Sequence, residues 1–479
     1  MKKITVCLSV LVLLMSLFGG ITASALSTKL DYQYDENKHS ISGPVTYEVK
    51  ERIYGSDLGV EKLDEPSDIF IDENNNIYIA DSGNNRILIF DDSWNLLREI
   101  SEISSPDEVN KLYGPKGVFA KNGIVYICDT ENSRVVAVNE NNEVIRLVKG
   151  EGLLSVNEKF VFKPEKMVVD SNDNILVSSS AVYQGIMRFN PQDEFKSFFA
   201  PNQVETSFGT FINSLLKSWF TDTQKESLRK NLPSPYSNLY ISEGDFIYTT
   251  AENVASGQDM KCLNSSGSNV LVYASVAASK EKYGDYETKY RQNAFIDIHC
   301  DDEGYMLVAD KNTQKLFLYD SECNLLSVFG GIGSEKKHFV SISSVEKLYD
   351  DYLILDSETD SITVMSPTEY IRSVMEAMQY YHKGEYTKSE NIWIKLLENN
   401  SNFPFAYRSL GRAQYHIGNY KKAMEYLEMG GDTYFYSLAL NGYRKELVQD
   451  NFLGLTIGSV LLIVGFVYLV KFIKKKLMS

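Results

Sequence analysis

The sequence predicts an all-β six-bladed propeller that is followed by an α-helical hairpin repeat and a single transmembrane helix. Short strand-like segments joined by polar turns recur at intervals of roughly 50 residues between residues 40 and 370. A second repeat, of helical character, follows with a spacing of 34 residues. Near the C-terminus, residues 452–470 form an apolar run of 19 residues without a charge.

The N-terminus has the features of a secretory signal. Lys2 and Lys3 precede an apolar run over residues 4–18, and the small residues Ala23 and Ala25 flank Ser24 where a signal peptidase would cut. We therefore expect residues 1–25 to be a removed signal peptide. An uncleaved N-terminal anchor is the alternative.

The C-terminal run is long enough to cross a bilayer, which needs roughly 20 apolar residues. Four lysines follow it within residues 471–479, and such basic flanks stay in the cytoplasm. The sequence thus predicts a single-pass protein of the cell membrane, with its N-terminus outside and a cytoplasmic basic tail. A buried core helix is the alternative.

The part of the chain expected outside the membrane is strongly acidic. The chain has 48 Lys and Arg residues and 64 Asp and Glu residues, and six of the lysines lie in the signal peptide and the basic tail. The remainder carries 42 basic and 64 acidic side chains, a net charge of −22. Nucleic acids bind to basic patches, so the sequence argues against a nucleic-acid partner.

The repeat between residues 40 and 370 is clearest in two copies. IYIAD at 77–81 is followed by NRI at 85–87, and IVYICD at 124–129 is followed by SRV at 133–135. Further copies cover residues 164–189, 296–320 and 352–364. Segments 238–241, 246–250 and 270–273 supply one more blade after a helical insertion at about 202–235. Each copy predicts one small antiparallel sheet, and residues 45–54 can complete the last of six sheets and close the ring.

These motifs resemble the NHL repeat over roughly 320 residues, which places the propeller at residues 40–368. The resemblance implies the fold more strongly than an activity, because most such propellers are binding platforms and a minority are amidating lyases or lactonase-like hydrolases. The aspartates that end the second strand of four copies are expected to stabilise turns rather than form a metal ring: Asp81, Asp129, Asp310 and Asp356.

In lactonase-like propellers the metal ligands lie at the mouth of the central channel, near the start of each innermost strand. The resemblance places five candidate ligand-binding residues there: Asp68, Lys116, Glu165, Lys166 and Asp297. The two lysines disfavour a divalent cation, so neither a catalytic residue nor a metal ligand is predicted. A cofactor is not expected, although Ca²⁺ stays open for the enzymatic alternative.

Four cysteines lie outside the signal peptide, and their spacing is not that of a zinc site. A bridge between Cys300 and Cys323 is open for an exported protein. Cys128 is expected to be a small buried apolar residue in the middle of a strand.

The helical repeat covers residues 369–448. YHKGEY at 381–386 is echoed by YHIGNY at 415–420, with glycines where a helix must end. The pattern resembles the tetratricopeptide repeat, which recurs at 34 residues. Its aromatic residues either pack a core or form a partner-binding groove, and we expect Tyr381, Tyr407 and Tyr415 to contribute to the groove.

Together these features predict a membrane-anchored, extracytoplasmic binding or scaffold protein without catalytic activity. The propeller face and the helices would engage another protein or a carbohydrate-like ligand. The alternative is a metal-dependent lyase or lactonase-type hydrolase that acts in the propeller channel.

Overall fold

The computed structural model describes residues 31–34, 39–104, 109–150, 162–201, 235–251, 259–271 and 294–477. The expected signal peptide and residues 202–234 of the expected insertion lie outside these residues. By its internal contacts the chain divides into two units. The first comprises residues 1–34 and 38–370, and the second comprises 35–37 and 371–479.

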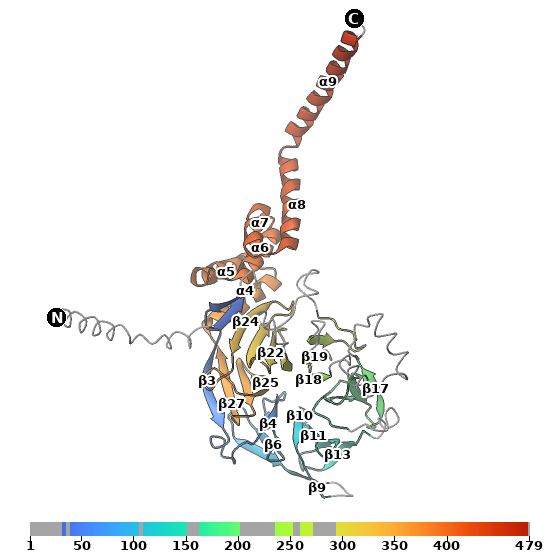
Figure 1. Ribbon diagram of the computed structural model, residues 1–479, viewed down its shortest axis with the longest axis vertical. Helices are drawn as coiled ribbons and strands as arrows, with labels where there is room; N and C mark the ends of the chain where they lie inside the picture. The colour runs from blue at the N-terminus through green and yellow to red at the C-terminus, as the bar shows by residue number, and fades with distance from the viewer. Residues whose placement is uncertain are drawn as a thin grey trace, which may run out of the picture. The chain divides into compact units, whose positions relative to one another are not determined.

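The first unit is a six-bladed β-propeller, as the sequence predicts (Figure 1). In each blade the strands follow one another antiparallel from the central channel outward. The innermost strands are β4 (Pro66–Ile71), β10 (Pro115–Lys121), β14 (Lys166–Val169), β18 (Tyr236–Ile241), β21 (Phe295–Cys300) and β25 (Ile342–Leu348). The second strands are β5 (Ile77–Asp81), β11 (Ile124–Asp129), β15 (Ile175–Ser178), β19 (Ile247–Ala251), β22 (Met306–Asp310) and β26 (Asp351–Asp356).

The third strands are β6 (Arg86–Phe90), β12 (Arg134–Val138), β16 (Ile186–Phe189), β20 (Met260–Leu263), β23 (Lys315–Tyr319) and β27 (Ser361–Pro367). The outermost strands are β7 (Leu96–Ile100), β13 (Val144–Val148), β17 (Phe195–Phe199), β24 (Leu325–Gly330) and β3 (Tyr47–Tyr54). A separate pair, β8 (Glu102–Ser104) and β9 (Val109–Lys111), follows the first blade.

The ring closes through strand β3, which comes from the N-terminal side of the repeats. It pairs with β27 from Tyr54 opposite Ser361 to Tyr47 opposite Pro367. The last blade is therefore built from both ends of the propeller sequence, as predicted for residues 45–54. This pairing removes the open edge that an unclosed ring would expose.

Apolar clusters hold neighbouring blades together. Between the first and last blades, Ile79 and Leu88 pack with Leu353 and Leu355, and Ile53 of the closing strand joins them. The second strands read as continuous buried runs because both faces of each blade are covered by neighbours.

Two parts of the propeller differ from the prediction. The third strand of the fourth blade is β20, which the sequence did not predict. Of the predicted segment 270–273, Val270 donates its backbone N–H to the Cys262 carbonyl oxygen at 2.7 Å, and residues 272 and 273 lie outside the described residues. Residues ahead of 40 also join the fold, because β1 (Asp31–Tyr34) and β2 (Ser40–Gly43) extend the fifth blade beyond β24. The buried Asp31 carboxylate accepts the Thr46 backbone N–H at 2.6 Å, which fixes this hairpin.

The cysteines are free in the structure, so the Cys300–Cys323 bridge left open by the sequence is absent among the described residues. Cys128 is a completely buried strand residue, as expected, and is the penultimate residue of β11.

The helical region begins after β27, and six helices are described in it: α4 (Glu369–His382), α5 (Tyr386–Asn399), α6 (Pro404–Ile417), α7 (Tyr420–Met429), α8 (Thr433–Asp450) and α9 (Phe452–Leu477). Gly384 and Gly418 follow the ends of α4 and α6 with φ of 76° and 89°, a conformation that favours glycine. The buried Ser389 hydroxyl donates to the Ala377 carbonyl oxygen at 2.7 Å and joins α5 to α4. This arrangement is compatible with tetratricopeptide-like hairpins, which stay a prediction.

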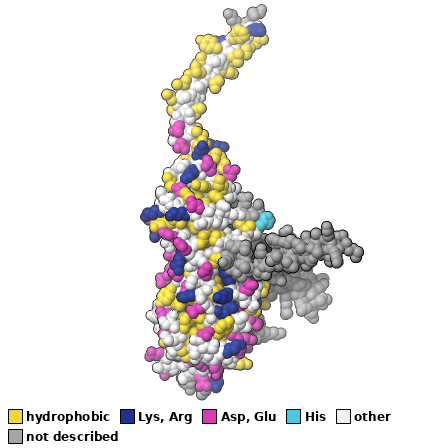
Figure 2. Space-filling model, turned by 90° about the vertical axis from the view of Figure 1, so that its left-hand side faces the viewer, with side chains coloured by type: hydrophobic (Ala, Val, Ile, Leu, Met, Phe, Trp, Pro, Cys, Tyr) yellow, Lys and Arg dark blue, Asp and Glu magenta, His cyan; other side chains and the backbone are white. Residues whose placement is uncertain are grey.

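Helix α9 is apolar along most of its length. Its segment Phe452–Lys474 has a mean hydropathy of 2.4, and within the described part of the chain it is the helix long and apolar enough to cross a membrane. Figure 2 shows hydrophobic side chains along the segment that ends at the C-terminus.

Candidate functional site

The central channel of the propeller brings together one residue from the start of each innermost strand. In five blades a register shift, such as the one between Pro66 and Asp68, sets which residue turns toward the channel. We call these six residues the channel ring: Asp68, Gly117, Lys166, Asn238, Asp297 and Ser344. Each pairs with the equivalent residue of its second strand, so the ring follows directly from the repeat.

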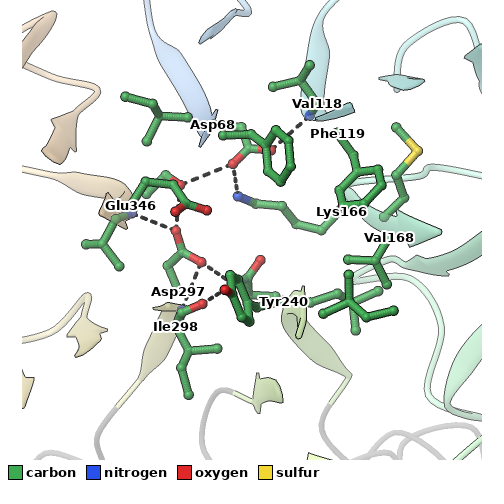
Figure 3. A pocket seen from close by; sticks show the side chains of 17 residues that line it. Asp68, Val118, Phe119, Lys166, Val168, Tyr240, Asp297, Ile298 and Glu346 are labelled. Carbon is green, nitrogen blue, oxygen red and sulfur yellow. Dashed lines mark hydrogen bonds and ion pairs between the residues drawn. The ribbon is translucent and has the colours of Figure 1, made fainter. Parts of the chain in front are cut away.

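An ion pair joins two sides of the channel ring. Lys166 reaches from the third blade to the Asp68 carboxylate of the first blade, where its Nζ contacts Oδ1 (Figure 3). The other oxygen of Asp68 accepts the Val118 backbone N–H at 2.9 Å. The Lys166 side chain is 12% exposed and that of Asp68 is 8% exposed, so the pair is almost removed from water.

Asp297 is the second carboxylate of the channel ring, and its two oxygens are also occupied. Oδ2 accepts the Ser344 hydroxyl at 2.5 Å and the Val345 backbone N–H at 2.7 Å. Oδ1 accepts the Ile298 backbone N–H at 2.9 Å and contacts the Asn238 side-chain amide. Ser344 Oγ also lies 3.1 Å from Asp68 Oδ1, so this hydroxyl bridges the two carboxylates.

Burial and neighbouring charges shift the pKa values of Asp68 and Lys166 in opposite directions. Burial raises the pKa of Asp68 to about 6, and the positive charge of Lys166 counteracts that rise. Burial by itself lowers the pKa of Lys166, but the negative charges of Asp68 and Asp297 outweigh it, so the net shift is upward. The lysine therefore stays charged and serves as the counter-ion of the buried carboxylates.

Two residues further along each innermost strand lies a second set of side chains, which we call the inner layer: Phe70, Phe119, Val168, Tyr240, His299 and Glu346. The Phe70 and Phe119 rings lie 4.8 Å apart. On the opposite side His299 Nδ1 lies 2.7 Å from Glu346 Oε2, and the Tyr240 ring is 4.9 Å from the imidazole. One half of this layer is thus apolar and the other half polar.

Five of the six residues of the channel ring, all but Gly117, and most of the inner layer line a cavity of about 40 Å³. A buried water molecule needs roughly 10 to 15 Å³ on the same scale, so the cavity has space for about three. Within the described ranges, no group of three or more His, Cys, Asp or Glu side chains is arranged to hold a metal ion.

The structure brings three of the five candidate ligand-binding residues into the channel: Asp68, Lys166 and Asp297. It places Lys116 and Glu165 outside the cavity, where Lys116 Nζ lies 3.6 Å from Glu165 Oε1. Glu165 also accepts the Ser180 backbone N–H at 2.6 Å. It thereby ties down the turn in which a serine replaces the aspartate of the other copies.

The sequence interpretation missed Asn238, Ser344 and Glu346, which complete the channel. Their signal is the repeat register: Asn238 and Ser344 occupy the positions of Asp68 and Asp297 in their own blades. Gly117 fills the remaining position, because a Cβ there would lie 2.4 Å from the Glu165 carbonyl oxygen.

The aspartates that end the second strands stabilise turns, as expected. Asp81 accepts the Asp64 backbone N–H and the Arg86 Nε–H, each at 2.8 Å. Asp129 accepts the Arg134 Nε–H at 2.7 Å. Both carboxylates are completely buried, and each ties the turn after its strand to a preceding loop.

Asp310 and Asp356 act in the same way in later blades. They accept the backbone N–H groups of Ala294 and Val340, each at 2.8 Å. Each of these carboxylates is therefore engaged within its own blade.

The helical unit contains an aromatic cluster that includes two of the predicted partner-binding residues. The His416 ring stacks on Tyr386 at 5.0 Å and lies 6.1 Å from Tyr381. Tyr415 contacts the Phe435 ring at 5.8 Å. Tyr407, the third predicted residue, instead pairs with Tyr426 at 6.5 Å.

Comparison with known proteins finds the NHL repeat model at residues 63–90. The chain is 25% identical to NHL repeat-containing protein 2 of Gallus gallus over 135 residues, which cover 27% of this chain and 19% of that protein. The match therefore spans about a fifth of the relative's length.

Solved structures with a similar arrangement include two bacterial enzymes. Selenomethionine-substituted virginiamycin B lyase from Staphylococcus aureus has a TM-score of 0.39 and 9% identity, with 71% of this chain and 88% of that chain covered. A gluconolactonase from Xanthomonas campestris has a TM-score of 0.38 and 9% identity, with 62% and 83% covered. The chain thus carries an NHL repeat within a six-bladed β-propeller, which is followed by a helical region with one apolar C-terminal helix.

Proposed function

We propose that this chain is a membrane-anchored, extracytoplasmic binding or scaffold protein that engages a protein or a carbohydrate-like ligand without catalysing a reaction. The observation that carries the proposal is the state of the propeller channel. Its carboxylates are bound by Lys166, Ser344 and backbone N–H groups, and the remaining space holds about three water molecules. A channel filled in this way stabilises the arrangement of the six blades. The ligand then binds on the outer surfaces of the protein.

The helical unit supplies one such surface. Tyr381, Tyr386 and Tyr415 are half-buried, so part of each ring is packed and part is open to solvent. Tyrosine combines a large apolar area with a polar hydroxyl, which suits a surface that binds a peptide or a protein. The proposed partner contacts this aromatic cluster through Tyr381 and Tyr415.

Membrane anchoring is assigned to helix α9. The lysines at 471, 474, 475 and 476 lie at its C-terminal end, after the uncharged run 452–470, and the positive-inside rule places them in the cytoplasm. The propeller and the helices α4 to α8 then lie outside the cell. A protease added to intact cells should remove the propeller and leave the C-terminal tail protected, whereas the opposite protection would contradict this orientation.

The binding role is tested on the full chain solubilised in detergent. We expect affinity purification to recover a partner, and Tyr381→Ala and Tyr415→Ala to weaken that recovery. Tyr349→Ala is the matched control, because Tyr349 is an exposed tyrosine of the propeller. Thermal unfolding against a panel of glycans and peptides should identify a ligand that raises the melting temperature. Recovery of no partner, together with no stabilising ligand, would refute the proposal.

A second candidate is a metal-dependent lyase or lactonase-type hydrolase in the channel. The observation in its favour is that Asp68 and Asp297 converge there. The buried pair of His299 and Glu346 lies in the next layer of the channel, two residues further along the innermost strands. This candidate requires a resident metal ion. Elemental analysis that finds about one Ca²⁺ or Zn²⁺ ion per chain in the purified protein would support it, and a metal-free, folded protein would remove it.

A further inference from the structure

An enzyme of the second kind needs a divalent cation at the mouth of the channel, and the residues of this chain do not fit such an ion. The position between the carboxylates is taken by a side chain of the protein itself. Lys166 Nζ contacts the Asp68 carboxylate, and the Ser344 hydroxyl links that carboxylate to the carboxylate of Asp297. An ammonium group at that place repels a second cation.

We propose that Lys166 is the resident cation of the channel ring and occupies the place of a divalent metal ion. The ring provides the oxygen atoms that a hard cation prefers: two buried carboxylates, a serine hydroxyl and a side-chain amide. These groups come from four blades, and the lysine reaches them from a fifth. Without a positive charge in their midst, the carboxylates of Asp68 and Asp297 would be buried side by side and uncompensated.

The proposal has a direct consequence for variants. When Lys166 is replaced by a neutral residue, the carboxylates keep their backbone donors but lose their counter-ion. Methionine is one heavy atom shorter than lysine, so the place of the ammonium group beside Asp68 is vacated. Together with the cavity of about 40 Å³, this place has space for an ion with attached water. The ring of such a variant should bind Ca²⁺, whose coordination tolerates irregular oxygen ligands and water better than that of Mg²⁺.

The experiment compares four forms of the full chain in detergent: wild type, Lys166→Met, Lys166→Arg and Lys116→Met. Lys116 is the matched control, because it lies next to Gly117 of the ring but pairs with Glu165 outside the cavity. Thermal unfolding is followed in EDTA and in millimolar CaCl₂. We expect Ca²⁺ to raise the melting temperature of Lys166→Met by at least about 4 °C and to leave the other three forms unchanged.

Each outcome decides the question. A calcium response of the wild type that Asp297→Asn abolishes would overturn the proposal, because the ring would then hold a metal beside the lysine. A Lys166→Met protein that unfolds equally in EDTA and in Ca²⁺, or that folds in neither, would also overturn it, since the ion should replace the ammonium group. Loss of the response in Lys166→Met/Asp297→Asn would confirm the ring as the site. These results do not depend on whether a binding partner is found.

Discussion

Replacing Lys166 with methionine removes a positive charge from the centre of the propeller and keeps most of the side-chain volume. The ammonium group contacts Asp68, and both side chains are at most 12% exposed. At an effective dielectric constant of about 20, two unit charges about 4 Å apart interact with about 4 kcal/mol. Breaking a buried ion pair by removing one partner costs about 3 to 5 kcal/mol, which agrees with that value.

We therefore expect Lys166→Met to lower the free energy of unfolding by about 4 kcal/mol at neutral pH. For a propeller of about 330 residues the entropy of unfolding is about 0.7 kcal/mol per kelvin, so each kcal/mol shifts the melting temperature by roughly 1.5 °C and the expected shift is about 6 °C. Thermal unfolding of the full chain in detergent and EDTA, followed by circular dichroism, measures it. The matched control Lys116→Met should cost no more than about 1 kcal/mol, because Lys116 is half exposed and 3.6 Å from its partner.

A double variant separates charge from packing. In Asp68→Asn/Lys166→Met the uncompensated carboxylate is gone, so we expect the double variant to regain about half of the stability lost in Lys166→Met. A Lys166→Met protein as stable as Lys116→Met would refute the assignment of Lys166 as a counter-ion. A double variant less stable than Lys166→Met would show that the loss comes from packing.

Four further experiments test individual residues of the propeller. The pKa of Asp68 is raised from its ordinary value of 3.8 to about 6, so the folded state binds more protons than the unfolded state between these values. Stability should therefore fall by about 2 kcal/mol as the pH rises from 4 to 6, and Asp68→Asn should flatten that part of the pH profile in urea titrations. Arg134→Met leaves the completely buried Asp129 without its arginine and should cost about 3 kcal/mol, whereas a cost below 1 kcal/mol would show that the turn does not need the pair. Gly117→Ala places a Cβ 2.4 Å from a backbone oxygen and should cost about 1 to 3 kcal/mol in the same denaturation assay, against little change for Gly244→Ala, whose nearest contact is 3.3 Å away. Alkylation of the denatured, unreduced protein should label both Cys300 and Cys323 in mass spectrometry, and protection of the two together would reveal a bridge.

Much of the propeller could be predicted because its signals are local. The IYIAD segment at 77–81 coincides with β5, since five apolar or turn-ending residues in succession suit a strand covered on both faces. The closing strand was also predictable, because residues 45–54 have strand character and the ring needs a partner for its last blade. Because the pattern recurs, the number of its copies predicted the number of blades.

The third strand of the fourth blade was missed for a physical reason. Strand β20 has only four residues, and Lys261 stands at a position that other blades fill with an apolar residue such as Leu88. Lys261 is nevertheless only 7% exposed, with its Nζ 3.3 Å from the Tyr236 hydroxyl. A charged residue at a buried position interrupts the apolar pattern by which such a strand is recognised in the sequence.

The position of the channel could be predicted from the sequence, but the full set of residues that line it could not. In the third copy the candidates were the adjacent residues Glu165 and Lys166, and neighbouring residues of a strand point to opposite faces. In five blades a register shift near the strand start decides which residue enters the channel. In the third blade the pairing is regular, and Lys166, which pairs with Ser178, lies in the ring whereas Glu165 does not. Ser344 forms hydrogen bonds with Asp297, which is 47 positions away in the sequence, and with Asp68, which is 276 positions away. Such contacts exist only once the ring of blades has closed.

A high-resolution experimental structure of the full chain, determined in millimolar Ca²⁺, tests the central claim most directly. The account predicts the Lys166 ammonium group against Asp68, with Ser344 between Asp68 and Asp297 and at most water in the cavity. A metal ion bound by Asp68 and Asp297, with Lys166 turned away from them, would contradict it.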